Sequence, residues 1–228
     1  MPTTNSSPVP VPGTVRFATL GPSGTNHELI TRRYLASQGI DDFEIKLILS
    51  FKDAIAMLLE DTVDYVMQCA VHPETPQTLG ENFRSVFAID CFISNSQELA
   101  VLSRRDVQRP ESIGVLLPAN EKYTDLSRWT RVVPYYSLPL INDALLAGEI
   151  DSGLVYRSCA DKHPDLLRVD EVIGSPDDVW IVYGRKRAFR DRLIGFGDGA
   201  FLEDVRARFD RMAATSPRAG IRDGSQRP

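Results

Sequence analysis

The fold is decided by the stretch VRFATLGPSGTNHE, residues 15–28. It is typical of a short β-strand, a glycine-rich turn and the start of a helix. Gly21 and Gly24 give the backbone the freedom that a tight turn needs. Thr25 stands three residues before Glu28, which is the spacing of a capping box. The sequence therefore predicts a strand, a turn and a capped helix in this stretch.

The start of this helix is also a candidate binding site. The first turn of a helix presents free N–H groups and the positive end of a dipole, which suits a carboxylate or a phosphate. An ordinary, well-capped turn without a ligand is the alternative. His27 lies in the first helical turn and is expected at the surface, with a place facing the site as the alternative. The residues expected to contact a ligand here are Gly21, Ser23, Gly24, Thr25 and Asn26.

Composition narrows the class of protein. The chain has 228 residues, 43% hydrophobic and 25% charged, which is typical of a soluble globular protein with one domain or two small ones. The net charge of −5 and the lack of a long basic run argue against a nucleic-acid partner. The three cysteines and three histidines show no metal-ligand or redox spacing. We therefore expect no metal site and reduced thiols.

Two further features bear on location. Residues 1–13 are rich in Pro, Thr and Ser and lack the basic and apolar regions of a signal peptide. No later segment approaches the run of about 20 apolar residues that a membrane span needs. We expect a cytoplasmic protein without a membrane partner. The oligomeric state is left open, with a homodimer as one option.

Strand and helix patterns alternate along the chain. Strand patterns cover 15–20, 44–49, 65–69, 85–93, 99–103, 113–117, 131–135, 151–156, 167–173 and 179–184. Helix patterns cover 25–37, 50–59, a short segment before 85, 120–129, 140–147, a short segment between 156 and 167, and 201–212. Such alternation predicts an α/β architecture with mostly parallel sheets.

An internal similarity suggests two lobes. The helix at 53–59 leads through a turn with Asp64 into a strand, and the segment 143–154 repeats this order loosely. Chance similarity between two ordinary helix-to-strand connections is the alternative. On the two-lobe interpretation each lobe has a small sheet flanked by helices, with a ligand cleft between the lobes. The expected division is a disordered leader at 1–13, lobe 1 at 14–93 and 176–214, lobe 2 at 94–175 and a disordered tail at 215–228.

Further site candidates follow the predicted strands, because ligands of open α/β sheets bind beyond the carboxyl ends of the strands. Gln68 ends the third strand. Asn120 and Lys122 offer amide and ammonium donors, with a helix cap and a solvated lysine as the alternatives. Arg157 follows a strand and could hold a carboxylate with two hydrogen bonds. A surface ion pair with Asp161 is the alternative for Arg157.

The six residues LGPSGT at 20–25 resemble the Leu-Gly-Pro-x-Gly-Thr opening of prephenate dehydratases. The resemblance extends in outline over residues 15–186 and implies the two-lobed fold of type 2 periplasmic binding proteins. Two departures matter. Where the dehydratases carry Glu-Asn-Ser after the third strand, this chain has QCAVHP at 68–73. Where their final strand carries a catalytic Thr-Arg-Phe, this chain has VWIVYGR at 179–185.

The non-aromatising prephenate decarboxylases, such as the bacilysin-pathway enzyme, are similar in these respects. They lack Thr-Arg-Phe and the ACT domain that usually follows in dehydratases. They also have a His near the end of the third strand and a Trp on the last strand, for which His72 and Trp180 look like counterparts. The resemblance implies that His72 is catalytic and that Trp180 lines the cleft, although an exposed loop histidine and a core tryptophan are the alternatives.

The resemblance implies a cofactor-free lyase, a decarboxylase, that acts on prephenate or a similar small carboxylic acid. Expulsion of the ring hydroxyl group would need a proton donor at that oxygen. The missing threonine therefore counts against dehydration. A prephenate dehydratase and a non-catalytic cytoplasmic protein that binds a small carboxylate are the alternatives.

Overall fold

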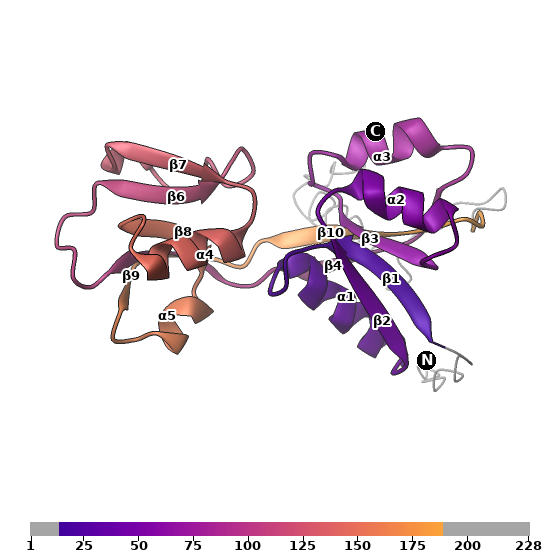
Figure 1. Cartoon of the computed structure of the whole chain (residues 1–228), viewed down its shortest axis with the longest axis horizontal. Helices are drawn as coiled ribbons and strands as arrows, with labels where there is room; N and C mark the ends of the chain where they lie inside the picture. Colours follow the sequence, from indigo (N-terminus) through magenta and orange to yellow (C-terminus); the bar gives the residue numbers. More distant parts are fainter. Residues whose placement is uncertain (1–13, 189–228) are drawn as a thin grey trace, which may run out of the picture. The chain divides into compact units, whose positions relative to one another are not determined.

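The computed structural model describes residues 14–188, and within this range ten strands form two sheets of five strands each (Figure 1). The first sheet has the order β2-β1-β3-β10-β4. Its strands are β1 (Val15–Leu20), β2 (Phe43–Ile48), β3 (Tyr65–Cys69), β4 (Phe87–Asn95) and β10 (Asp177–Gly184). Its helices are α1 (Asn26–Ser37), α2 (Phe51–Leu59) and α3 (Thr75–Asn82).

The second sheet has the order β7-β6-β8-β5-β9. Its strands are β5 (Leu99–Arg104), β6 (Ser112–Leu116), β7 (Arg131–Tyr135), β8 (Ser152–Tyr156) and β9 (Leu167–Gly174). The helices in this part of the chain are α4 (Leu138–Ala147), α5 (Ser158–Lys162) and a single 3₁₀ turn, η1 (Leu126–Arg128).

Both sheets follow one pairing scheme. β1 pairs in parallel with β2 and β3, and β6 pairs in parallel with β7 and β8. The remaining pairs, β10 with β3 and β4, and β5 with β8 and β9, are antiparallel. The α/β class is confirmed, and each sheet is mixed rather than mostly parallel. β4 leads directly into β5, and β9 leads directly into β10, without a helix between them.

The internal similarity corresponds to equivalent structure. α2 leads into β3 beside β1, and α4 leads into β8 beside β6. The helix expected at 120–129 is wrong, because only η1 is helical there. The Asp125 carboxylate accepts hydrogen bonds from the Ser127 N–H and hydroxyl group, at 3.0 and 2.7 Å, and such local bonds compete with a helix. The helix expected at 201–212, the leader and the tail lie outside the described residues.

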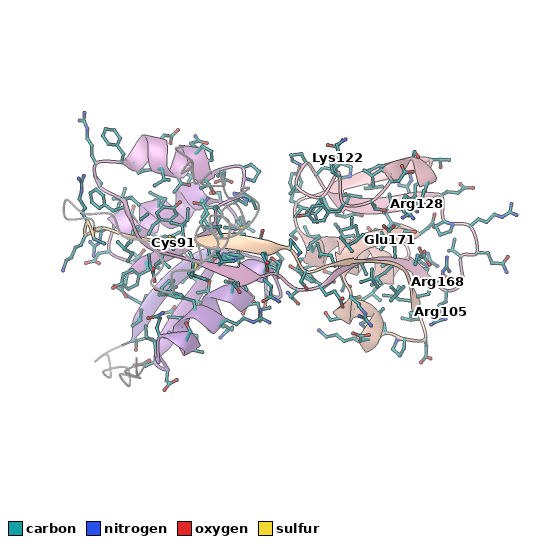
Figure 2. All side chains as sticks on the ribbon, turned by 180° about the vertical axis from the view of Figure 1, so that it is seen from behind. Cys91, Arg105, Lys122, Arg128, Arg168 and Glu171 are labelled. Carbon is teal, nitrogen blue, oxygen red and sulfur yellow. The ribbon has the colours of Figure 1, made fainter. Side chains whose placement is uncertain are left out.

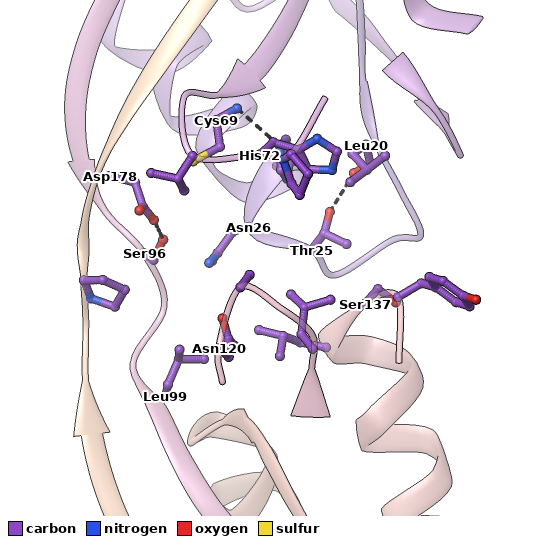
Figure 3. Close-up of a pocket in the computed structure, with 18 of the residues that line it drawn as sticks. Leu20, Thr25, Asn26, Cys69, His72, Ser96, Leu99, Asn120, Ser137 and Asp178 are labelled. Atoms are coloured by element: carbon purple, nitrogen blue, oxygen red, sulfur yellow. Dashed lines mark hydrogen bonds between the residues drawn. The ribbon is translucent and has the colours of Figure 1, made fainter. Parts of the chain in front are cut away.

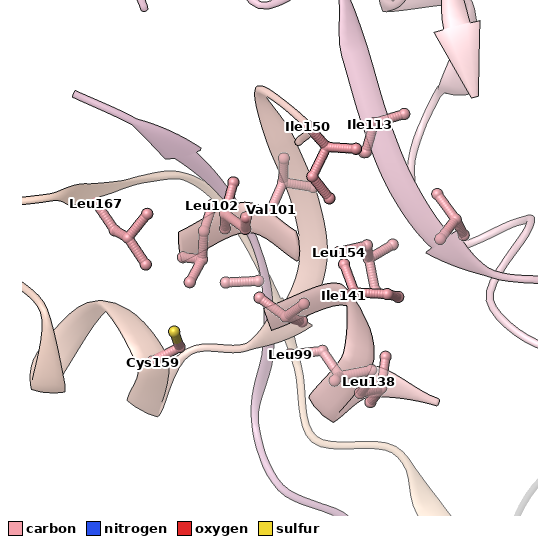
Figure 4. Close-up of a cluster of buried hydrophobic side chains, with 14 of the residues drawn as sticks. Leu99, Val101, Leu102, Ile113, Leu138, Ile141, Ile150, Leu154, Cys159 and Leu167 are labelled. Atoms are coloured by element: carbon pink, nitrogen blue, oxygen red, sulfur yellow. The ribbon is translucent and has the colours of Figure 1, made fainter. Parts of the chain in front are cut away.

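Each sheet has its own apolar packing. α1 and α2 cover separate clusters of the first sheet, one around Phe17, Ile30 and Trp180 and one around Phe51, Leu58 and Tyr183. In the second sheet, α4 packs against β6 and β8, where side chains such as Ile113, Ile141, Leu145, Ile150 and Leu154 are buried (Figure 4). Burial of each such side chain contributes about 1.5–3 kcal/mol. These clusters hold the strand ends, from which the candidate site is built, in place.

Candidate functional site

A pocket of about 550 Å³ lies at the carboxyl ends of parallel strands from both sheets (Figure 3). From the first sheet it is lined by residues that follow β1 and β3, among them Gly21 and His72. From the second sheet it is lined by residues that follow β6 and β7 and by Tyr156 at the end of β8. This is the edge where open α/β sheets bind ligands.

The turn before α1 closes on itself. Thr25 is the N-cap, and its hydroxyl oxygen accepts from the Glu28 N–H at 3.3 Å while the O–H donates to the Leu20 carbonyl at 2.9 Å. The Glu28 carboxylate accepts from the Gly24 N–H at 2.9 Å and from the Ser23 hydroxyl at 2.8 Å. These bonds, led by the one from Gly24, lower the pKa of Glu28. The capped helix is confirmed, with its cap donors already paired.

The first N–H of α1 is also occupied. The backbone N–H of Asn26 donates to the Tyr156 hydroxyl oxygen at 3.0 Å, and the Asn26 Oδ1 accepts from the Gln97 N–H at 3.1 Å. Burial raises the pKa of Tyr156 to about 12, so this hydroxyl group stays protonated over the physiological range. Its O–H donates to no described residue and is free to reach a ligand.

Aromatic rings and imidazoles gather on the first-sheet side of the pocket. The His27 ring centroid lies 5.0 Å from that of Trp180 and 5.9 Å from that of His72, and Phe51 packs 4.9 Å from His72. Burial, with a smaller effect of His72, lowers the pKa of His27 to about 3. Burial also lowers the pKa of His72, against a raising effect of Glu74. The expectation that His27 lies on the surface is wrong, because its ring faces inward among these aromatic groups.

The hydrogen bonds of the two imidazoles determine which nitrogen carries the proton. The Nε2 atom of His27 accepts from the Cys69 N–H at 3.3 Å, and the Nδ1 atom of His72 accepts from the Glu74 N–H at 3.2 Å. A neutral imidazole has one acceptor nitrogen and one N–H donor. The lowered pKa values keep both rings neutral at pH 7, so His27 presents Nδ1–H and His72 presents Nε2–H as donors.

Charge on the described lining is acidic. Among residues 14–188 no lysine or arginine lines the pocket, whereas the carboxylates of Glu74 and Asp178 do. The Glu74 carboxylate accepts from the Phe51 N–H at the start of α2, at 3.0 Å. The Asp178 carboxylate accepts from the Ser96 hydroxyl group. Both carboxylates are therefore paired with donors from the protein.

The structure brings only some of the expected site residues together. Those that line the pocket are Gly21, Thr25, Asn26, His72, Asn120 and Trp180, and those that do not are Ser23, Gly24, Gln68, Lys122 and Arg157. Arg157 forms its ion pair with Glu98 at 2.8 Å rather than with Asp161. Lys122 is exposed (Figure 2). It lines a separate pocket with Glu121 and Thr124. Gln68 is fully buried on β3, and its side-chain amide has no described partner.

Sequence reasoning missed Ser137 and Asp178 as pocket residues. Asp178 carries no local signal, because its place depends on pairing between distant strands. Ser137 had one, since a serine just before an apolar helix with a proline in its first turn is a typical helix start.

Two further searches covered the described residues. No group of three or more His, Cys, Asp or Glu side chains within residues 14–188 could hold a metal ion. In the same range, every helix is too short or too polar to cross a membrane.

No family model and no curated protein sequence matches this chain. Solved structures do. Prephenate dehydratase from Arthrobacter aurescens, in complex with L-Phe, superposes with a TM-score of 0.57 at 17% identity, over 86% of this chain and 73% of that chain. The quorum-quenching acylase GqqA superposes with a TM-score of 0.50 at 11% identity, over 81% and 68%. The Escherichia coli aliphatic sulphonate-binding protein SsuA gives a TM-score of 0.43 at 11% identity, over 90% and 70%.

At these identities the likeness concerns the fold alone. The chain has the α/β fold of prephenate dehydratase, which confirms the expected type 2 periplasmic-binding-protein-like class. The chemistry of the site has to be argued from its own residues.

Proposed function

We propose that this chain is a cofactor-free lyase that decarboxylates prephenate or a similar small cyclic carboxylic acid in the pocket. The observation that carries the proposal is the N–H of His72, held toward a pocket whose described lining has no lysine or arginine. The likeness to prephenate dehydratase supports the substrate class, and the aromatic rings around His27 suit a cyclic substrate.

The same environment favours loss of carbon dioxide. A ring carboxylate beside Trp180 and His27 would lose water contacts and would meet no lysine or arginine of the described lining, which destabilises the carboxylate relative to neutral carbon dioxide. The carbon–carbon bond breaks, its electron pair enters the diene of the ring, and a ring carbon takes up one proton. The leaving group is carbon dioxide, and the proton comes from solution.

His72 is the proposed proton donor. An anionic ligand raises the pKa of a neighbouring imidazole, so His72 would take up a proton as the substrate binds. The Glu74 carboxylate also raises the pKa of His72 and would stabilise the imidazolium. His72 then protonates the ring carbon, directly or through a water molecule, and is recharged from solution.

A binding protein without turnover is the second candidate. The observation that favours it is the neutrality of both imidazoles, each of which already accepts a backbone hydrogen bond. Such a pocket can hold a ligand by neutral donors without transferring a proton. Dehydration of prephenate is the third possibility, and it requires a donor at the ring hydroxyl group.

Product analysis separates the three. Purified protein is mixed with prephenate near pH 8, with a protein-free sample as the control for spontaneous reaction, and ultraviolet spectra and mass spectra are recorded. The proposal predicts release of carbon dioxide and a non-aromatic dihydro product. Phenylpyruvate would assign the chain to dehydration. Saturable binding with an unchanged spectrum would favour the binding protein, and neither binding nor turnover would exclude prephenate.

A further inference from the structure

The starts of the helices that border the pocket differ in one respect. α1 is capped by Thr25, and its first N–H donates to Tyr156. α2 is capped by Ser50, whose hydroxyl oxygen accepts from the Asp53 N–H, and its first N–H donates to Glu74. At both starts the N–H groups of the first and the third helical residue bond within the protein.

The start of α4 is unpaired within the described part of the chain. Ser137 occupies the N-cap position, but its hydroxyl group makes no cap hydrogen bond. The side chain is 7% exposed, and its Oγ atom is buried without a described partner. The N–H of Leu138 donates to no described residue either. A buried hydroxyl group without a partner is unusual and requires an explanation.

The unpaired group faces the pocket, because Ser137 and Leu138 both line it (Figure 3). Asn120 lines the same pocket, is 6% exposed, and its side-chain amide bonds to no described residue. β6 and β7 are parallel neighbours, and Leu116 lies opposite Tyr135. Because the two strands end side by side, the segments that follow them begin at the same edge of the sheet. The topology thus places the Asn120 amide and the start of α4 at the same edge.

The opposite side of the pocket repels anions. Glu74 and Asp178 belong to the first sheet's side, together with the rings of His27 and Trp180. An anionic group is therefore favoured at α4, where the helix dipole adds to the free N–H. The apolar part of the same ligand is favoured against the rings.

We propose that the start of α4 binds a carboxylate group of the ligand through the Ser137 hydroxyl group and the Leu138 N–H, with the Asn120 amide as a further donor. The ligand class is a carboxylic acid whose carboxylate is joined to a ring. One detail of the inference rests on the proposed function. If prephenate is the substrate, its side-chain carboxylate binds at the start of α4 and its ring carboxylate lies near His72.

The test uses benzoate as the probe and the full chain labelled with ¹⁵N. Backbone amide signals are followed in the wild type, in Ser137→Ala and in the matched control Ser50→Ala. The expected result is a saturable shift of the Ser137 and Leu138 amide signals in the wild type. Ser137→Ala should weaken benzoate binding about tenfold, the size of one charge-assisted hydrogen bond, with little change in melting temperature. Ser50→Ala should lower the melting temperature and leave affinity unchanged.

Three results would overturn the inference: no shift at α4, shifts at Asn26 and His27 instead, or equal affinity of Ser137→Ala and the wild type. Inorganic sulfate is the second probe, and tighter binding of sulfate than of benzoate at α4 would overturn the assignment to a carboxylate. Failure of the proposed function is recognised separately. If benzoate binds at α4 but prephenate is not turned over, the proposed lyase activity is wrong and the carboxylate site stands. If Ser137→Ala turns over and binds prephenate as well as the wild type does, the carboxylate site is wrong and the lyase activity stands.

Discussion

The hydroxyl group of Tyr156, at the end of β8, accepts a hydrogen bond of 3.0 Å from the backbone N–H of Asn26, the first residue of α1. The two residues are 130 positions apart, and Tyr156 belongs to the second sheet whereas α1 packs on the first. A side chain of the second sheet thus provides the hydrogen-bond acceptor for the first N–H group of α1, at the margin of the pocket.

Replacement of Tyr156 by phenylalanine should expose the N–H of Asn26 to water. A net loss of about 1 kcal/mol for one hydrogen bond corresponds to roughly fivefold faster amide exchange at this residue. Hydrogen exchange followed by NMR measures the effect. Tyr135→Phe is the matched control, because the Tyr135 hydroxyl group bonds to no described residue. An unchanged amide exchange rate of Asn26 in Tyr156→Phe would show that this hydrogen bond does not protect the amide in solution.

Replacement of His72 by glutamine should lower the turnover number for prephenate by about 10²–10⁴-fold, the usual range for general acid–base catalysis. The dissociation constant, measured by calorimetry, should change little, since the Glu74 N–H can still bond to an amide oxygen. His163→Gln, outside the pocket, is the control. A large loss of affinity with an unchanged turnover number would make His72 a binding residue.

Acid should destabilise the protein through His27. In the unfolded chain this residue binds a proton below about pH 6.5, whereas in the fold its pKa is about 3. The unfolded state therefore holds more protons between these values, and the free energy of unfolding falls as the pH drops, by at most about 1.4 kcal/mol per pH unit for this group. His72 acts in the same direction.

Urea unfolding at several pH values measures this dependence. His27→Gln should flatten this dependence between pH 6.5 and 4, whereas Ser50→Ala, which removes no titratable group, should not. Parallel curves for His27→Gln and the wild type would mean that the imidazole takes up its proton in the folded state as readily as in the unfolded chain.

A methyl group added at Gly114 should destabilise the second sheet. Its Cβ would lie 2.7 Å from Cδ1 of Ile150 and 2.9 Å from Cγ2 of Ile141, inside a buried cluster. Overpacking of this kind costs about 1–3 kcal/mol. Gly80→Ala is the control, because nothing lies within 4 Å of the added Cβ and alanine favours the helix. Urea unfolding should show loss of stability in Gly114→Ala only.

Local signals were sufficient for much of the fold. The stretch at 15–28 contains its own strand, turn and cap, and β1, α1 and the Thr25 cap follow it closely. β3 and β7 agree with the expected ranges for the same reason, since each is a short apolar run between turn residues. The helix expected at 120–129 failed because the side chains of Thr124 and Asp125 bond outside a helical pattern.

The site depends on partners that are distant in sequence. The pairing of β10 with β3 places Trp180 beside Cys69, and through it beside His27, which no local pattern reveals. Arg157 pairs with Glu98 because β8 and β5 are neighbours, although Asp161 is closer in sequence. The residues after β1 and β3 were found because strand ends are recognisable locally. The Tyr156–Asn26 bond was not.

The place of β10 has a consequence for synthesis on the ribosome. All strands of the second sheet lie between residues 99 and 174, so this sheet can be complete as soon as that contiguous segment has emerged. The first sheet cannot be complete so early, because β10 lies between β3 and β4 and is the last strand within residues 14–188 to be made. We expect the edges of β3 and β4 that pair with β10 to stay unpaired while the second sheet folds. The first sheet, whose strands are mostly translated first, is therefore completed last.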